Sequence, residues 1–178
     1  MRIELRPDVQ APEGEAVGLA DGEVLAYVGR TPHIGGCPCR QADIAPALAI
    51  AVSEAASQVW GGEWTLDLSR VTGLNRRTVT KDRIEKYGLP SWVLALVGRA
   101  AAHPHPRALG YFLLGAADIH DSADRWHDST IKSLATIPSR DGLELKAWKA
   151  AESAVDMVYL AREERFKSRL HKVDNTNS

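Results

Sequence analysis

The stretch DLSRVTGLNRRTVTKDRIEKYG, residues 67–88, joins a short polar segment to a basic one through a glycine. Leu68 is placed to bury one face of a first helix. Gly73 lies where the chain must turn, because glycine adopts the left-handed conformation without steric cost. Asn75 is a good N-cap for a second helix, and Val79 falls inside that helix as its core anchor. The stretch therefore predicts two helices joined by a tight turn.

This stretch carries a net positive charge, although the chain as a whole does not. The formal net charge of the 178 residues is -1. Between residues 67 and 86, six Arg or Lys stand against three Asp or Glu, which is a local charge of +3. Any affinity of this protein for nucleic acid must therefore come from a local patch rather than from the whole molecule.

The segment LSRVTGLNRRTVTKDRI resembles the helix-turn-helix of bacterial and phage transcriptional regulators, in which a small residue, a glycine, a polar cap and an opening like RRTV recur. The resemblance is confined to residues 66–87. It implies that one helix enters the major groove of DNA while the other braces it. Such motifs usually bury an apolar residue three positions after Val79, where this chain has Asp82. We expect Ile84 and Tyr87 to anchor the second helix instead.

The resemblance implies a set of DNA contacts. Arginine near the start of the second helix pairs with guanine edges, and threonine or lysine further along suits phosphates. The predicted groove residues are Arg76, Arg77, Thr78, Thr80 and Lys81, behind the cap Asn75, and the predicted phosphate contacts are Arg70, Arg83 and Lys86. Two other interpretations remain open. The stretch is also compatible with a solvated helical corner, or with a helical interaction module whose basic patch meets an acidic protein.

The remainder of the chain predicts a mainly α fold with a small N-terminal β-hairpin or sheet. Residues 1–7 alternate apolar and polar side chains, and residues 22–30 are rich in β-prone types. Residues 31–39 carry two prolines and two glycines, which is typical of a loop. We therefore expect a β element and loop over residues 1–40 and a helical domain over residues 41–178.

Apolar spacing predicts most of the helices. Residues 41–60 place Ile44, Leu48 and Val52 on one face, and residues 89–102 are apolar on most sides, as expected of a central helix. A long helix is predicted over residues 142–170. Its apolar positions are Trp148, Ala151, Val155 and then Val158 or Tyr159, after which Arg162 ends the stripe. A single helix-turn-helix seldom gives useful specificity, so we expect a homodimer with this helix as the dimer element.

An alternative function follows from the sequence DIHDSADRWHD at residues 118–128. On a helix, His120, Asp124 and His127 share one face, and such a set can hold a divalent metal that generates hydroxide for a metal-dependent hydrolase. His103 and His105 precede the same element. The two His-Asp pairs resemble the His-Asp dipeptide of HD-type phosphohydrolases, although that family spreads its ligands over several helices.

A second candidate metal set is His33, Cys37 and Cys39, which together with one further ligand would suit zinc. The Cys-x-Cys spacing is shorter than the usual two-residue spacer, and a loop with free thiols is the simpler interpretation. We therefore predict no bound cofactor and assign no catalytic residue.

The absence of several sequence signals argues against some compartments and some activities. No apolar run approaches the roughly 20 residues that cross a bilayer, and no signal peptide pattern opens the chain. Two cysteines two positions apart do not make a disulfide framework. The chain has no phosphate-binding glycine loop and no serine nucleophile elbow. These features favour a cytoplasmic protein that contacts no membrane.

Overall fold

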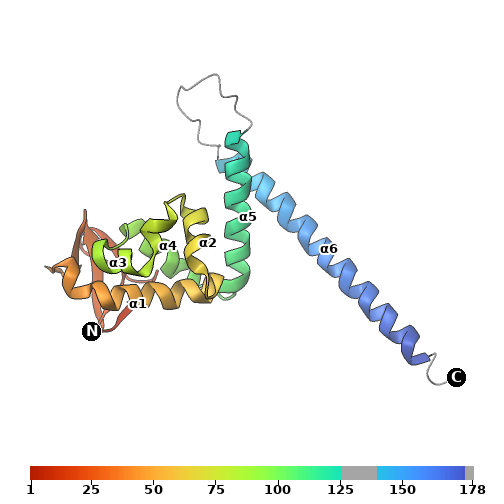
Figure 1. Ribbon diagram of the computed structural model, residues 1–178, viewed down its shortest axis with the longest axis horizontal. Coiled ribbons are helices and arrows are strands. Elements are labelled where there is room, and N and C mark those ends of the chain that lie inside the picture. Colours follow the sequence, from red (N-terminus) through yellow and green to blue (C-terminus); the bar gives the residue numbers. More distant parts are fainter. Residues whose placement is uncertain (126–139, 175–178) are drawn as a thin grey trace. The chain divides into compact units, whose positions relative to one another are not determined.

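The computed structural model describes the backbone of residues 1–125 and 140–174, and the side chains of residues 1–121 and 141–163. Two compact units divide the chain, one spanning Met1–Leu114 and one that begins at Gly115. Figure 1 shows the strands and the helices α1 to α4 in the first unit and the long helix α6 in the second.

An antiparallel sheet forms the N-terminal part of the first unit. In the part of the chain that the structure describes, its five strands follow one another in the order β1-β2-β3-β4-β5. They are β1 (Ile3–Leu5), β2 (Glu15–Ala20), β3 (Glu23–Val28), β4 (Thr31–Ile34) and β5 (Cys37–Pro38). The predicted mainly α class is therefore wrong, because a complete sheet joins the helices in a mixed α and β fold.

The predicted loop over residues 31–39 is a hairpin. Ile34 pairs with Cys37, and the two glycines between them, Gly35 and Gly36, have φ values of 57° and 85°. Two consecutive residues with positive φ make the tight turn whose twist matches that of a β-hairpin. Pro38 lies in β5, at the edge of the sheet, where a missing N–H removes no ladder hydrogen bond. The glycines of residues 31–39 thus form the turn of the hairpin and Pro38 lies at the sheet edge, so this glycine- and proline-rich composition is compatible with strands.

Strand β2 was not predicted, because its sequence EAVGLA lacks a clean alternation. The register between β2 and β3 shifts between Ala16 and Gly18, so the strand carries a bulge that breaks the period of two. Gly18 pairs with Leu5 in the neighbouring β1, and a Cβ added at this glycine would collide with the carbonyl oxygen of Glu4. Close approach of two backbones therefore requires the glycine.

The helices largely follow the predicted bounds. They are α1 (Gln41–Trp60), α2 (Trp64–Thr72), the 3-10 turn η1 (Arg76–Val79), α3 (Lys81–Tyr87), α4 (Ser91–Ala101), α5 (Pro106–Arg125) and α6 (Arg140–Asp174). The helices predicted over 41–60 and 89–102 correspond to α1 and α4, and the long C-terminal helix corresponds to α6. Helix α5 continues through Gly110 and Gly115, although glycine disfavours a helix interior.

Helix α1 organises the core of the first unit. It contacts β1, α2, α3 and α4, while α4 also packs on β1 and β2 (Figure 1). The predicted inner face of α1 is confirmed, since Ile44, Leu48 and Val52 are all fully buried. Val79 and Ile84, from η1 and α3, join the same cluster. The segment of interest, residues 64–87, is therefore held against the central helix of this unit.

Candidate nucleic-acid interface

The turn after α2 has the predicted conformation. Gly73 closes the helix with φ 70° and ψ 4°, which is the left-handed region. The Ser69 hydroxyl donates to the carbonyl of Leu74 at 2.9 Å, and the amide of Leu74 lies 3.4 Å from the Thr72 hydroxyl. Leu68, the predicted buried residue of this helix, is fully buried. The end of α2 and the turn are thus fixed by side-chain hydrogen bonds to the backbone.

Substitution of Gly73 tests this turn. An added Cβ would meet nothing within 4 Å, so the cost of a side chain comes only from the left-handed backbone. Gly73→Ala is expected to lower the free energy of unfolding by about 1 kcal/mol, whereas Gly73→Asn should cost less because asparagine tolerates this conformation. Urea unfolding followed by circular dichroism measures both. Equal costs for alanine and asparagine would contradict the assignment.

The second helix predicted from Asn75 is not continuous. The Asn75 side chain accepts a hydrogen bond from the Arg77 amide at 2.9 Å, so the residue is a cap, but it caps only the single turn η1. Thr80 is then extended, with ψ 149°, and the Thr80 hydroxyl donates to the Arg77 carbonyl at 3.2 Å. Helix α3 begins at Lys81 and has seven residues. The expectation of one basic helix from Asn75 is therefore corrected to two short pieces.

Burial explains the interruption. Val79 and Ile84 are both 0% exposed and lie in the same core cluster. Five residues of unbroken α-helix would set these side chains about 140° apart, on different faces. The extended backbone at Thr80 changes the rotation of α3 relative to η1, so that Val79 and Ile84 both point into the core. β-Branched side chains at Thr78, Val79 and Thr80 also disfavour a helix.

Exposure of the predicted DNA contacts is nearly complete. In the corner formed by α2, η1 and α3 (residues 64–87), the six cations are all exposed and none forms an ion pair with a carboxylate among the described residues. They are Arg70, Arg76, Arg77, Lys81, Arg83 and Lys86. Asn75 and Thr78 are also exposed, and Thr80 is half-buried. We call these six cations the basic corner.

Charge is distributed unevenly around α3. The Arg83 guanidinium lies 4.7 Å from the ring centre of Tyr87, and the Lys86 ammonium lies 5.2 Å from it. These three residues occupy one flank of the helix, while Asp82 and Glu85 lie toward the other. Tyr87 is 60% exposed, so the predicted anchoring role falls to Ile84 alone. An exposed ring held between two cations was not evident from the sequence, because only its exposure distinguishes it from a core tyrosine.

The predicted zinc set is divided between two faces of the sheet. His33 pairs with Pro38, whereas Cys37 pairs with Ile34. Because successive side chains alternate between faces, Cys37 and Cys39 share the face of Ile34 and His33 lies on the opposite one. His33 Nδ1 lies 3.0 Å from the carbonyl of Thr31. The structure therefore does not bring these ligands together.

Cys39 and its surroundings do not favour thiolate chemistry. Burial raises the pKa of the Cys39 thiol, and Asp43 acts in the same direction. The neighbouring Tyr27 hydroxyl donates to Gln41 Oε1 at 3.1 Å, and burial raises the pKa of Tyr27 to about 12. Both groups are therefore held in their neutral forms at neutral pH, as expected of structural side chains.

The second metal set lies mostly outside the described residues. His120 Nδ1 is 3.7 Å from a carboxylate oxygen of the adjacent Asp121. The side chains of Asp124 and His127 are not among those described. The rings of His103 and His105 stack edge to face, 6.3 Å apart. Within the described residues, no three metal-ligating side chains gather into a site.

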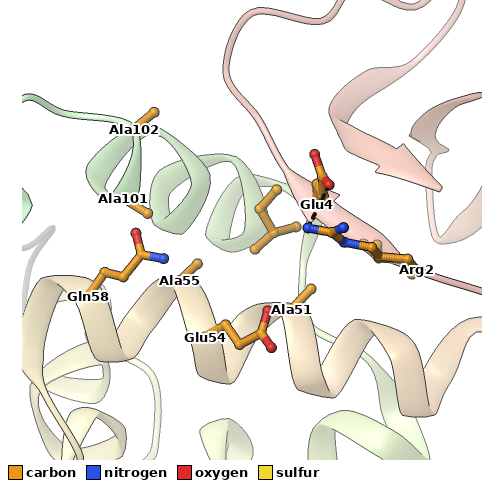
Figure 2. Close-up of a pocket in the computed structure, with 10 residues that line it drawn as sticks. Arg2, Glu4, Ala51, Glu54, Ala55, Gln58, Ala101 and Ala102 are labelled. Atoms are coloured by element: carbon orange, nitrogen blue, oxygen red, sulfur yellow. Dashed lines mark ion pairs between the residues drawn. The ribbon is translucent and has the colours of Figure 1, made fainter. Parts of the chain in front are cut away.

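A shallow pocket of about 280 Å³ lies between β1, α1 and the end of α4. Figure 2 shows Arg2 and Glu4 on one side, joined by an ion pair of 3.1 Å, and Glu54 and Gln58 of α1 opposite them. Alanines form the rest of the labelled wall, at positions 51, 55, 101 and 102. The ionisable lining residues are Arg2, Glu4 and Glu54, and no lining residue carries a thiol, hydroxyl or imidazole.

Comparisons with protein-family models, with curated proteins and with solved structures find no match for this chain. None of the helices within the described residues has both the length and the apolar character needed to cross a membrane.

Proposed function

We propose that the basic corner binds double-stranded DNA and that the protein is a transcriptional regulator or a phage- or plasmid-type accessory protein acting in the cytoplasm. The observation that carries this proposal is the exposure of all six cations without a carboxylate partner among the described residues. Elsewhere in the first unit, Arg6 and Arg40 are paired with aspartates at 2.6 Å and 2.7 Å. Arg30 and Arg99 are exposed without such a partner in the described part of the chain, but they do not form a cluster of six within one segment.

Electrostatics favours a polyanionic partner for this corner. A cation that already pairs with a carboxylate gains little from a phosphate, because it must exchange one anion for another. Each unpaired cation that neutralises a phosphate releases a condensed counterion, and this release contributes most of the affinity for DNA. Because the formal net charge of the whole chain is -1, binding to DNA depends on the local charge of +3 in residues 67–86.

The two short pieces suggest separate roles in the proposed complex. Arg76, Arg77 and Thr78 on η1 project from the turn and reach base edges in the groove, together with Lys81 at the start of α3. Arg83 and Lys86 contact phosphates, and the Tyr87 hydroxyl between them donates to a phosphate oxygen. Because α3 has only seven residues, base readout depends on η1 as much as on α3.

Duplex binding by the full chain tests the proposal. We expect Arg76→Ala with Arg77→Ala to weaken binding to a fluorescein-labelled random duplex at least tenfold at low salt. The slope of log affinity against log salt should become shallower by about 0.9 for each phosphate that the variant no longer neutralises. Fluorescence anisotropy at two or more salt concentrations measures both quantities.

A matched control separates the corner from general charge. Arg30 and Arg99 are exposed and lie outside the corner, so Arg30→Ala with Arg99→Ala removes the same charge elsewhere. We expect this pair to leave affinity within about twofold of the parent. Equal losses in the two double variants, or no measurable binding by the parent protein, would contradict the proposal. Binding of an acidic protein but not of duplex would instead identify an interaction module.

A further inference from the structure

Helix α6 exposes an apolar stripe along its described side chains. Trp148, Val155 and Val158 are 71%, 62% and 54% exposed, and Ala151 completes the stripe. The four positions follow a spacing of three and four residues, which is the seam of a two-stranded coiled coil. Three of these four side chains are exposed and Ala151 is half-buried, so the stripe is largely open to solvent.

Charges at the two ends of the stripe are opposite. The next seam position before Trp148 is Glu144, and the next after Val158 is Arg162. Both side chains are exposed, and neither forms an ion pair with the described residues. A partner for this face must therefore offer a cation at one end, a carboxylate at the other, and apolar side chains between them.

A second copy of α6 in the antiparallel direction meets this requirement. The seam alternates between two kinds of position. In an antiparallel coiled coil, a position of one kind packs against a position of the other kind on the partner helix. Trp148 therefore packs against Val158 of the partner, and Ala151 packs against Val155. The same pairing sets Glu144 against Arg162 at both ends. A parallel pair in register would instead oppose Glu144 to Glu144 and Arg162 to Arg162, which is repulsive.

Flanking residues agree with the antiparallel arrangement. Leu145 and Tyr159 lie on one flank of the seam, and the two-fold axis brings this flank of one copy to the same flank of the other. Leu145 then lies beside Tyr159 of the partner. Leu145 and Tyr159 are 56% and 70% exposed, so this contact adds apolar area. Glu152 of each copy lies at the axis on this flank, where the two carboxylates oppose the pairing and Lys149, one turn away on the same helix, offsets part of their repulsion.

We propose that the protein forms a homodimer through antiparallel pairing of α6 over residues 144–162. The paired segment is about 27 Å long. Aromatic side chains bury about 150–250 Å² each, so Trp148 and Tyr159 from two copies supply roughly half of the 1,200 Å² typical of the smallest specific interfaces. The pairing concerns α6 alone, so it is independent of the proposed DNA binding.

Charge exchange in the full-length protein tests both the dimer and its direction. By sedimentation equilibrium without DNA, we expect the parent protein to be a dimer and Glu144→Arg to weaken dimerisation at least tenfold, because the introduced arginine would face Arg162 of the other copy. Arg162→Glu should weaken it similarly. The double variant with both changes should recover parent-like dimerisation, because the opposite charges are restored in exchanged positions.

Each other outcome overturns the proposal. A parent protein that stays monomeric at 100 µM (about −5.5 kcal/mol of association as the detection limit) excludes the dimer. A dimer that is insensitive to Glu144→Arg has another interface or a parallel arrangement, and a double variant that fails to recover excludes this pairing. Far-ultraviolet circular dichroism checks that the variants keep the helical content of the parent. Since no DNA is present, the result is separate from the duplex-binding experiment.

Discussion

Replacement of Ile84 by alanine is expected to lower the free energy of unfolding of the first unit by about 3 kcal/mol. Ile84 is the one residue of α3 that is fully buried, and α3 packs on α1. Truncation of this side chain leaves a cavity under a helix of only seven residues, in which no other residue is buried. Urea unfolding monitored by tryptophan fluorescence measures the effect, since Trp60 and Trp64 are buried in this unit.

Tyr87 provides the matched control on the same helix. Its side chain is 60% exposed and contacts Arg83 and Lys86 rather than the core. We therefore expect Tyr87→Ala to change the free energy of unfolding by less than about 1 kcal/mol, in the range of an exposed cation–π contact. If Tyr87→Ala were as costly as Ile84→Ala, α3 would be rotated so that Tyr87 also packs on the core, and the basic corner would be oriented differently.

Replacement of Gly110 by alanine is the second large effect expected. A Cβ added at Gly110 would collide with the carbonyl oxygen of Val59, in the last turn of α1. A backbone atom within a packed helix cannot move aside cheaply, so the start of α5 must shift away from α1. We expect a loss of about 2–3 kcal/mol in the free energy of unfolding.

Gly115 lies in the same helix and serves as the control for Gly110. An added Cβ there meets nothing within 4 Å, and alanine has the higher helix propensity. Gly115→Ala should therefore leave stability unchanged or raise it by up to about 1 kcal/mol. Thermal unfolding of both variants by circular dichroism measures the difference. Destabilisation by both substitutions to a similar degree would mean that steric contact with Val59 is not the cause.

Local signals in the sequence predicted several features correctly. Helix α1 has the predicted bounds of residues 41–60, because apolar spacing and the following glycines define it without reference to other elements. Gly73 adopts the left-handed conformation and Asn75 is a cap, because both depend on the backbone within a few residues. The apolar positions of α6 could be read in the same way.

The sheet was underestimated for a different reason. Strands β2, β4 and β5 are short, and their sequences contain glycine and proline. Composition alone indicates a loop there, because a strand is stabilised by the partner beside it rather than by its own propensity. Leu25 in β3 pairs with Gly18 on one side and Ile34 on the other, and only this pairing makes strands of both flanking segments.

By itself, the sequence determined where the chain turns and where it carries charge: the left-handed turn at Gly73, the cap at Asn75 and the six cations of the basic corner. Only the tertiary structure decided how that charge is presented. Val79 and Ile84 both pack against the core, and a straight helix cannot direct two residues five positions apart to one face. The extended backbone at Thr80 allows Val79 and Ile84 both to reach the core. Burial of both side chains stabilises the unit more than an unbroken helix would.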